Sequence, residues 1–197
     1  MSNYDNLIEE YKHNGLTIKL WYDWDNGNDP TDWGNYKIVQ FRDDDFSTYE
    51  NIDDYLTENG KLLPSVQAKM RAGKLFSLSY SRYSNTDGGF YRLDGGIYTG
   101  EVDSRELNGW IEFDDAYIKG TTYAERRTYA EQDLLTYTEW ANGECYGWTV
   151  ETPDGDQIDS CWGYIGGTAD DLKQEAEAIA DAVRSSSFAK NARELHR

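Results

Sequence analysis

The chain has 197 residues, of which 38 % are apolar and 15 % aromatic, and it carries a formal net charge of -18. This length is enough for one domain with its own core, and no apolar run approaches the roughly 20 residues that a membrane-spanning helix needs. A field of this sign repels nucleic acid and anionic lipid and favours partners with a basic surface.

The beginning of the chain is polar and acidic, unlike a signal peptide, so we expect a soluble protein located in the cytoplasm. Two cysteines, Cys145 and Cys161, are too few for a disulfide framework, and we expect both to be free thiols.

Apolar periodicity predicts the elements of the N-terminal part. Residues 3–11 have helical spacing, and Asn14-Gly15 follows as a C-terminal stop. Residues 16–24 alternate and predict a strand, residues 25–35 predict a loop rich in turn formers, and residues 36–42 predict the antiparallel partner of that strand.

The rest of the chain predicts helices and short strands, ending in a helix, a hairpin and a second helix. Short helices are expected at residues 47–59 and 64–72, and a long one at 121–141. The expected strands are residues 74–83, 90–93, 97–102 and 110–113. After the hairpin, Thr168 is the expected N-cap of the last helix.

This order predicts an α+β fold: a mainly antiparallel sheet with flanking helices and a C-terminal helix–β-hairpin–helix. We expect one domain over residues 1–197, with sub-units at 1–60 and 61–197 as the alternative.

Residues 144–167 contain the strongest local signal. Pro153, Asp154 and Gly155 are typical of a type I turn closed by a glycine bulge. If Thr152 faces Asp156, Val150 falls opposite Ile158, Trp148 opposite Ser160 and Tyr146 opposite Trp162. We therefore expect Tyr146, Val150, Ile158 and Trp162 to be buried together, with Glu151 and Asp159 outside.

Candidates for a metal site are weak. Asp23, Asp25, Asn28 and Asp29 begin like a calcium loop, but the twelfth position is Gly34, where a bidentate Glu is required. A second oxygen-rich group, Asp154, Asp156 and Asp159, is explained by the preference of Asp for hairpin turns. We predict no metal and no cofactor.

Candidates for catalysis are weak too. The two histidines, His13 and His196, lie near opposite termini, where each is interpreted as a surface residue at a helix end. No nucleophile motif and no phosphate-binding glycine loop is present. We predict no catalytic residue, although a hydrolase with paired carboxylates stays open.

Trp21, Trp24 and Trp33 could stack on single-stranded nucleic acid. Neighbouring carboxylates would repel its phosphates, so we expect these tryptophans to pack the loop onto the sheet.

The acidic residues are concentrated between positions 23 and 58, where Lys37 and Arg42 are the basic residues. Arranged on one surface, such carboxylates could imitate the phosphates of duplex DNA and bind a basic, DNA-binding protein. A solvated acidic face without a partner is the competing interpretation. The predicted partner-binding residues are Asp23, Asp25, Asp29, Asp32, Asp43, Asp44, Asp45, Glu50, Asp53, Asp54 and Glu58.

The hairpin resembles a group of small, acidic, largely uncharacterised proteins of bacteriophages and other mobile elements. The N-terminal part of the group has a Trp-Asp-Asn or similar triplet, for which Trp33, Gly34 and Asn35 stand here, with Gly in place of the Asp. The hairpin residues that carry the resemblance are Tyr146, Gly147, Trp148, Glu151, Asp154, Gly155, Asp159, Ser160, Cys161, Trp162, Gly163 and Tyr164.

The resemblance implies a phage accessory protein expressed in the bacterial cytoplasm, and no known active site comes with it. We therefore expect a non-enzymatic counter-defence inhibitor that binds a host nuclease or other DNA-binding protein through its acidic surface. The alternatives are a divalent-metal-dependent enzyme that uses clustered Asp residues, and a phage regulatory or assembly scaffold.

Overall fold

The structure is a computed structural model that describes residues 6–23, 29–41, 50–82, 89–94 and 107–194. The fold is α+β, as predicted, with two antiparallel sheets instead of the one expected. The chain divides into unit 1, residues 1–28 with 143–197, and unit 2, residues 29–142. This division differs from the alternative of sub-units at 1–60 and 61–197. The reason is that residues 146–151 of the C-terminal hairpin pair with residues 17–22 of an N-terminal strand.

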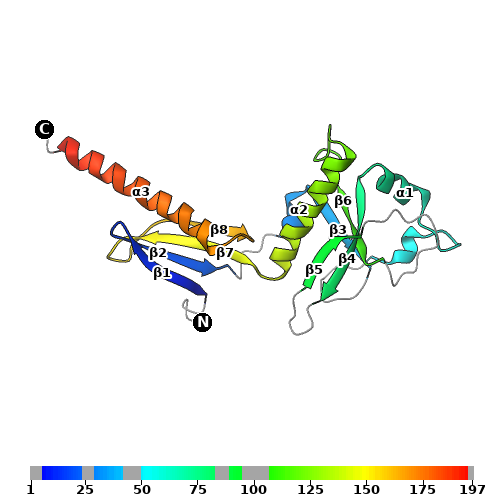
Figure 1. Cartoon of the computed structure of the whole chain (residues 1–197), viewed down its shortest axis with the longest axis horizontal. Helices are drawn as coiled ribbons and strands as arrows, with labels where there is room; N and C mark the ends of the chain where they lie inside the picture. The colour runs from blue at the N-terminus through cyan, green and yellow to red at the C-terminus, as the bar shows by residue number, and fades with distance from the viewer. Residues whose placement is uncertain (1–5, 24–28, 42–49, 83–88, 95–106, 195–197) are drawn as a thin grey trace. The chain divides into compact units, whose positions relative to one another are not determined.

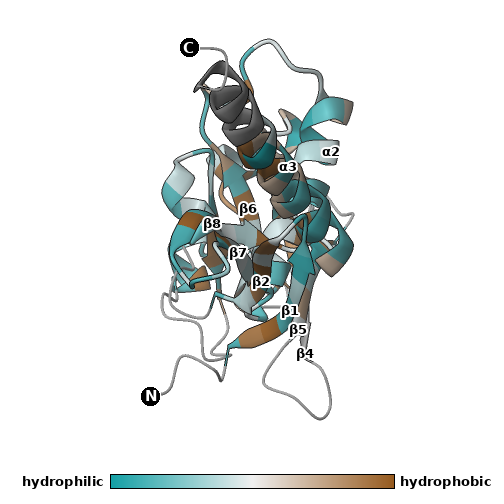
Figure 2. Cartoon of the chain, turned by 90° about the vertical axis from the view of Figure 1, so that its left-hand side faces the viewer, coloured by the Kyte–Doolittle hydropathy of each residue, from teal (hydrophilic) through white to brown (hydrophobic). Residues whose placement is uncertain are grey.

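Unit 1 is a four-stranded sheet in the order β1-β2-β7-β8, with helix α3 packed on β2 and β7 (Figure 1). Apolar residues of β2 and α3 are brown in Figure 2. The elements are β1 (Leu7–His13), β2 (Leu16–Tyr22), β7 (Cys145–Glu151), β8 (Gln157–Ile165) and α3 (Ala169–Glu194). The buried core consists of Ile18, Leu20, Trp148, Val150, Leu172, Ala176 and Ala180.

The predicted helix over residues 3–11 is wrong, because residues 7–13 form strand β1, paired with β2. Asn14 and Gly15 have φ values of 51° and 86°, the left-handed pair that a two-residue hairpin turn requires. Asn-Gly therefore closes a hairpin here and does not end a helix. Pairing with β2 and packing of Ile8 and Tyr11 on the unit 1 core override the local helical spacing.

The second hairpin has the predicted turn but not the predicted register. The Thr152 N–H donates to the Asp156 carbonyl at 2.8 Å, and Gly155 has a φ of 91°. Val150 pairs with Asp159, Trp148 with Cys161 and Tyr146 with Tyr164, with irregularities after Val150 and between Trp148 and Tyr146. Each irregularity adds one residue to β8, which changes the face of the residues that follow.

The bulges overturn part of the burial prediction. Ile158 and Trp162 are 36 % and 42 % exposed, whereas Val150 is buried as predicted. The Trp162 ring lies so close to Gly147 that a Cβ there would come within 2.3 Å of it. Glycine at 147 is therefore what allows the indole to lie on the strand.

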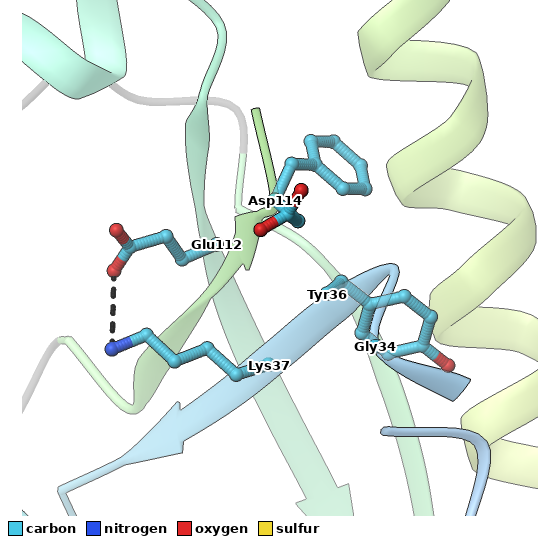
Figure 3. A pocket seen from close by; sticks show the side chains of 6 residues that line it. Gly34, Tyr36, Lys37, Glu112 and Asp114 are labelled. Carbon is cyan, nitrogen blue, oxygen red and sulfur yellow. Dashed lines mark ion pairs between the residues drawn. The ribbon is translucent and has the colours of Figure 1, made fainter. Parts of the chain in front are cut away.

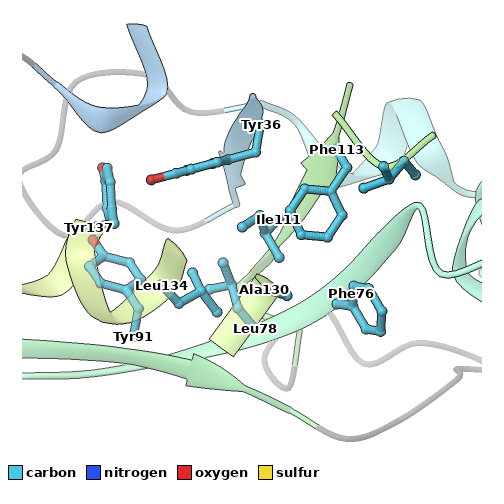
Figure 4. Packing of buried hydrophobic residues seen from close by; sticks show 10 residues of the cluster. Tyr36, Phe76, Leu78, Tyr91, Ile111, Phe113, Ala130, Leu134 and Tyr137 are labelled. Carbon is cyan, nitrogen blue, oxygen red and sulfur yellow. The ribbon is translucent and has the colours of Figure 1, made fainter. Parts of the chain in front are cut away.

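Unit 2 is a second four-stranded antiparallel sheet, in the order β3-β6-β4-β5. Helix α2 covers one face, and its core side chains are drawn in Figure 4, where Leu134 and Tyr137 of α2 meet Tyr36, Tyr91 and Ile111 of the sheet. Helix α1 and the short helix η2 supply the core of the other face. The elements are η1 (Pro30–Trp33), β3 (Tyr36–Gln40), η2 (Ile52–Tyr55), α1 (Pro64–Arg71), β4 (Leu75–Arg82), β5 (Gly89–Leu93), β6 (Gly109–Phe113) and α2 (Tyr123–Ala141).

Two predictions for unit 2 are wrong. Strand β3 pairs with β6 and not with β2, since β2 already has β1 and β7 on its two sides. In place of a helix over residues 47–59, the described residues form the one-turn 3-10 helix η2, capped by the Asn51 side chain. The strand predicted at residues 97–102 lies outside the described residues.

The helices with strong end signals are where the sequence predicts them. The Thr122 hydroxyl accepts the Glu125 N–H, and the Glu125 carboxylate accepts the Thr122 N–H at 2.7 Å, a complete capping box for α2. Thr168 caps α3 through a similar exchange with Asp171.

Candidate functional site

The predicted acidic site includes four residues that lie outside the described residues, namely Asp25, Asp43, Asp44 and Asp45. Asp23 is described and does not belong to an acidic surface, because it is only 6 % exposed. Its carboxylate accepts the Gly163 N–H at 2.9 Å, next to the bulge that carries Trp162. Asp23 therefore has a structural role in the hairpin, which its sequence neighbourhood did not indicate.

The other six predicted residues all belong to unit 2. Asp29 caps η1 by accepting the Thr31 N–H at 2.8 Å and the Thr31 hydroxyl at 2.7 Å. Glu50 is half-buried, while the remaining four carboxylates are exposed: Asp32, Asp53, Asp54 and Glu58. Their short helices fold locally because Asx side chains cap both of them, with Pro30 in the first turn of η1.

These six carboxylates are not compensated by basic residues of the described chain. None of them forms an ion pair with a described Lys, Arg or His. Three lysines of unit 2 pair with other carboxylates: Lys69 and Lys37 with Glu112 at 2.5 and 3.4 Å, and Lys74 with Asp115 at 2.5 Å. The negative charge of the four exposed carboxylates, Asp32, Asp53, Asp54 and Glu58, is therefore available to an incoming cation.

The three N-terminal tryptophans differ from one another. Trp21 is half-buried on β2 and donates its Nε1–H to the Thr149 hydroxyl at 3.2 Å, as the packing interpretation predicts. Trp33 on η1 is 53 % exposed, so the interpretation is wrong for this residue. Trp24 lies outside the described residues.

A pocket of about 270 Å³ opens directly after Trp33. It is formed at the start of β3 and the end of β6, where the Tyr36 ring and the Lys37–Glu112 ion pair lie on different sides (Figure 3). The lining residues are Gly34, Tyr36, Lys37, Glu112, Phe113 and Asp114. The pocket is thus open and polar, with two carboxylates and one ammonium group.

Asp133 is a half-buried carboxyl on α2, which sequence reasoning did not single out. Burial raises its pKa to about 6, while a hydrogen bond from Tyr117 acts in the opposite direction. Its Oδ2 atom is buried and has no hydrogen-bond partner among the described residues. Burial and the charge of Asp133 raise the pKa of Tyr36 and Tyr117, whose rings belong to the surrounding core.

The other candidate chemical groups have structural partners. His13 is at the end of β1, not at a helix end, and its Nε2 lies 2.8 Å from the Asp181 carboxylate of α3. Cys145 and Cys161 are free thiols, as predicted, and burial raises the pKa of Cys145. Within the described ranges, no three His, Cys, Asp or Glu residues are grouped closely enough to hold a metal ion.

Comparison of the chain with family models, curated proteins and solved structures found no match. The helices of the described residues include none with the length and apolar character needed to cross a membrane.

Proposed function

We propose that the chain is a phage accessory protein, a non-enzymatic counter-defence inhibitor that binds a host DNA-binding protein or nuclease through its acidic residues. The observation that carries this proposal is the uncompensated charge of unit 2. Asp32, Asp53, Asp54 and Glu58 are exposed, and within the described residues they have no ion pair.

The physical basis is competition with DNA. A protein surface that binds DNA carries Lys and Arg side chains, which neutralise phosphates and release counterions. Exposed carboxylates of unit 2 offer the same side chains an alternative set of negative groups. Binding of this kind depends steeply on salt, because screening shortens the range of the attraction to about 8 Å at physiological ionic strength.

The test measures binding to purified bacterial nucleases and other DNA-binding proteins by calorimetry, at about 50 mM and about 300 mM salt, with a DNA duplex as competitor. We expect binding that weakens at least tenfold at the higher salt, as several charge contacts require, and that the duplex displaces. Salt-insensitive binding, or binding that the duplex leaves unchanged, would refute the proposal.

Two matched variants separate the predicted residues from the total charge. The first replaces Asp32, Asp53, Asp54 and Glu58 by Asn or Gln. The second replaces four exposed carboxylates of unit 1 in the same way: Glu10, Asp154, Asp156 and Asp170. Both lose the same charge, so only the first variant should lose affinity if unit 2 carries the contact; equal losses would assign the binding to net charge alone.

A further inference from the structure

Trp33 has an exposed side chain on a backbone segment that is capped at both ends. Helix η1 begins with the buried Pro30 and is capped by Asp29. It ends at Gly34, whose φ of 75° lets the chain turn into β3. The 53 % exposed indole is therefore carried by a backbone that its cap and Pro30 already hold in place, which lowers the ordering cost when a partner binds.

The surroundings of Trp33 are acidic. Asp32 belongs to the short helix and Asp29 caps it, and Gly34 is already part of the pocket that Lys37, Glu112 and Asp114 line. Asp114 has no ion pair with a described residue; its Oδ1 accepts the Ala116 N–H at 2.8 Å. Glu112 is shared between Lys37 and Lys69. The pocket volume of about 270 Å³ is sufficient for one long side chain.

We propose that Trp33 and the adjoining pocket bind an arginine-rich segment of the partner. One guanidinium group stacks on the indole, and a neighbouring basic side chain enters the pocket toward Asp114. This inference rests on the proposed function. It adds that Trp33 is the main contact residue and that the partner binds through arginine. Arginine fits better than lysine, because its planar guanidinium stacks on an aromatic face and is more weakly hydrated.

An exposed tryptophan is also the side chain most suited to dominate such a contact. Trp and Arg are enriched among the few interface residues that carry most of the binding energy. The carboxylates around Trp33 attract the cation, while the indole supplies the contact area that a salt-screened ion pair lacks.

The test uses the full chain and hexa-arginine as the probe, with binding measured by calorimetry. We expect Trp33→Ala to weaken binding by more than about twofold and up to about fivefold, the change that an exposed cation–π contact supports. Trp33→Tyr should retain part of the affinity, and hexalysine should bind the wild type more weakly than hexa-arginine. Trp162→Ala is the control, because it removes a 42 % exposed tryptophan from unit 1.

Asp114→Asn tests the pocket while preserving the oxygen that caps Ala116. It should weaken hexa-arginine binding, with unchanged circular dichroism. The inference is overturned if hexa-arginine does not bind, if Trp33→Ala stays within about twofold of the wild type, or if Trp162→Ala weakens binding equally. The proposed function would survive that result if the variant with Asp32, Asp53, Asp54 and Glu58 replaced still shows weaker binding to the DNA-binding protein.

Discussion

Replacement of Asp133 by Asn should change how stability depends on pH. Asp133 has an ordinary pKa of 3.8 that burial raises to about 6 in the folded chain. The folded state therefore binds its proton more tightly than the unfolded state does. The stabilisation from the protonated carboxyl is complete below about pH 4 and is lost as the pH rises through about 6.

The size of the effect follows from the two pKa values. Their difference corresponds to about 3 kcal/mol, and partial exposure of the side chain reduces this to about 1 to 2 kcal/mol. Asn carries no charge at any pH, so Asp133→Asn should gain that amount over the wild type between about pH 4 and pH 8. The prediction concerns how the stability difference between Asp133→Asn and the wild type changes with pH. Its absolute value is not predicted, because the buried amide of Asn has a desolvation cost that is the same at every pH.

The assay is urea unfolding followed by circular dichroism at several pH values, for wild type, Asp133→Asn and the control Asp32→Asn. The other carboxylates contribute equally to the pH dependence of the free energy of unfolding in variant and wild type, so their contribution cancels in the difference. Asp32 is exposed and belongs to the same unit, so its variant removes one charge without removing a buried carboxylate. The reasoning is refuted if the free energies of unfolding of Asp133→Asn and the wild type differ by the same amount, within about 0.3 kcal/mol, from about pH 4 to pH 8. Burial would then not destabilise the ionised carboxyl.

Two further predictions concern backbone features. Gly147→Ala should destabilise unit 1 by about 1 to 3 kcal/mol, because its Cβ would lie 2.3 Å from the Trp162 ring and 2.9 Å from the Cys161 carbonyl oxygen; an unchanged melting temperature would show that the bulge adapts freely. Thr122→Ala should cost about 1 kcal/mol by removing the capping box of α2, whereas Thr122→Ser should retain it, and equal urea midpoints for all three chains would contradict this role.

Several elements could be predicted because their signals are local. The capping pair Thr122 and Glu125, the Pro153–Asp154–Gly155 turn, and alternation along β2 specify structure within a few residues. The net charge and the free thiols also need no tertiary information. These signals were sufficient for the α+β class and for the helix–hairpin–helix at the C-terminus.

The candidate site could be predicted only in part. The acidic composition near η1 and η2 is visible in the sequence, but the burial of Asp23 depends on Gly163, a residue 140 positions away. The exposure of Trp33 likewise depends on how η1 packs, and the pocket beside it forms only when β3 meets β6. Asp133 gave no signal, because the tyrosines around it come from distant parts of the chain.

The sequence by itself determined the net charge, the Pro153–Asp154–Gly155 turn and the caps of α2 and α3. The turn and the caps each depend on neighbours within a few residues. The tertiary structure alone decided that residues 7–13 form a strand, that β3 pairs with β6, and that two bulges turn Trp162 toward Gly147. Strand pairing joins residues far apart in the chain, and one extra residue moves a side chain to the opposite face of the sheet, so neither outcome is encoded in a local pattern.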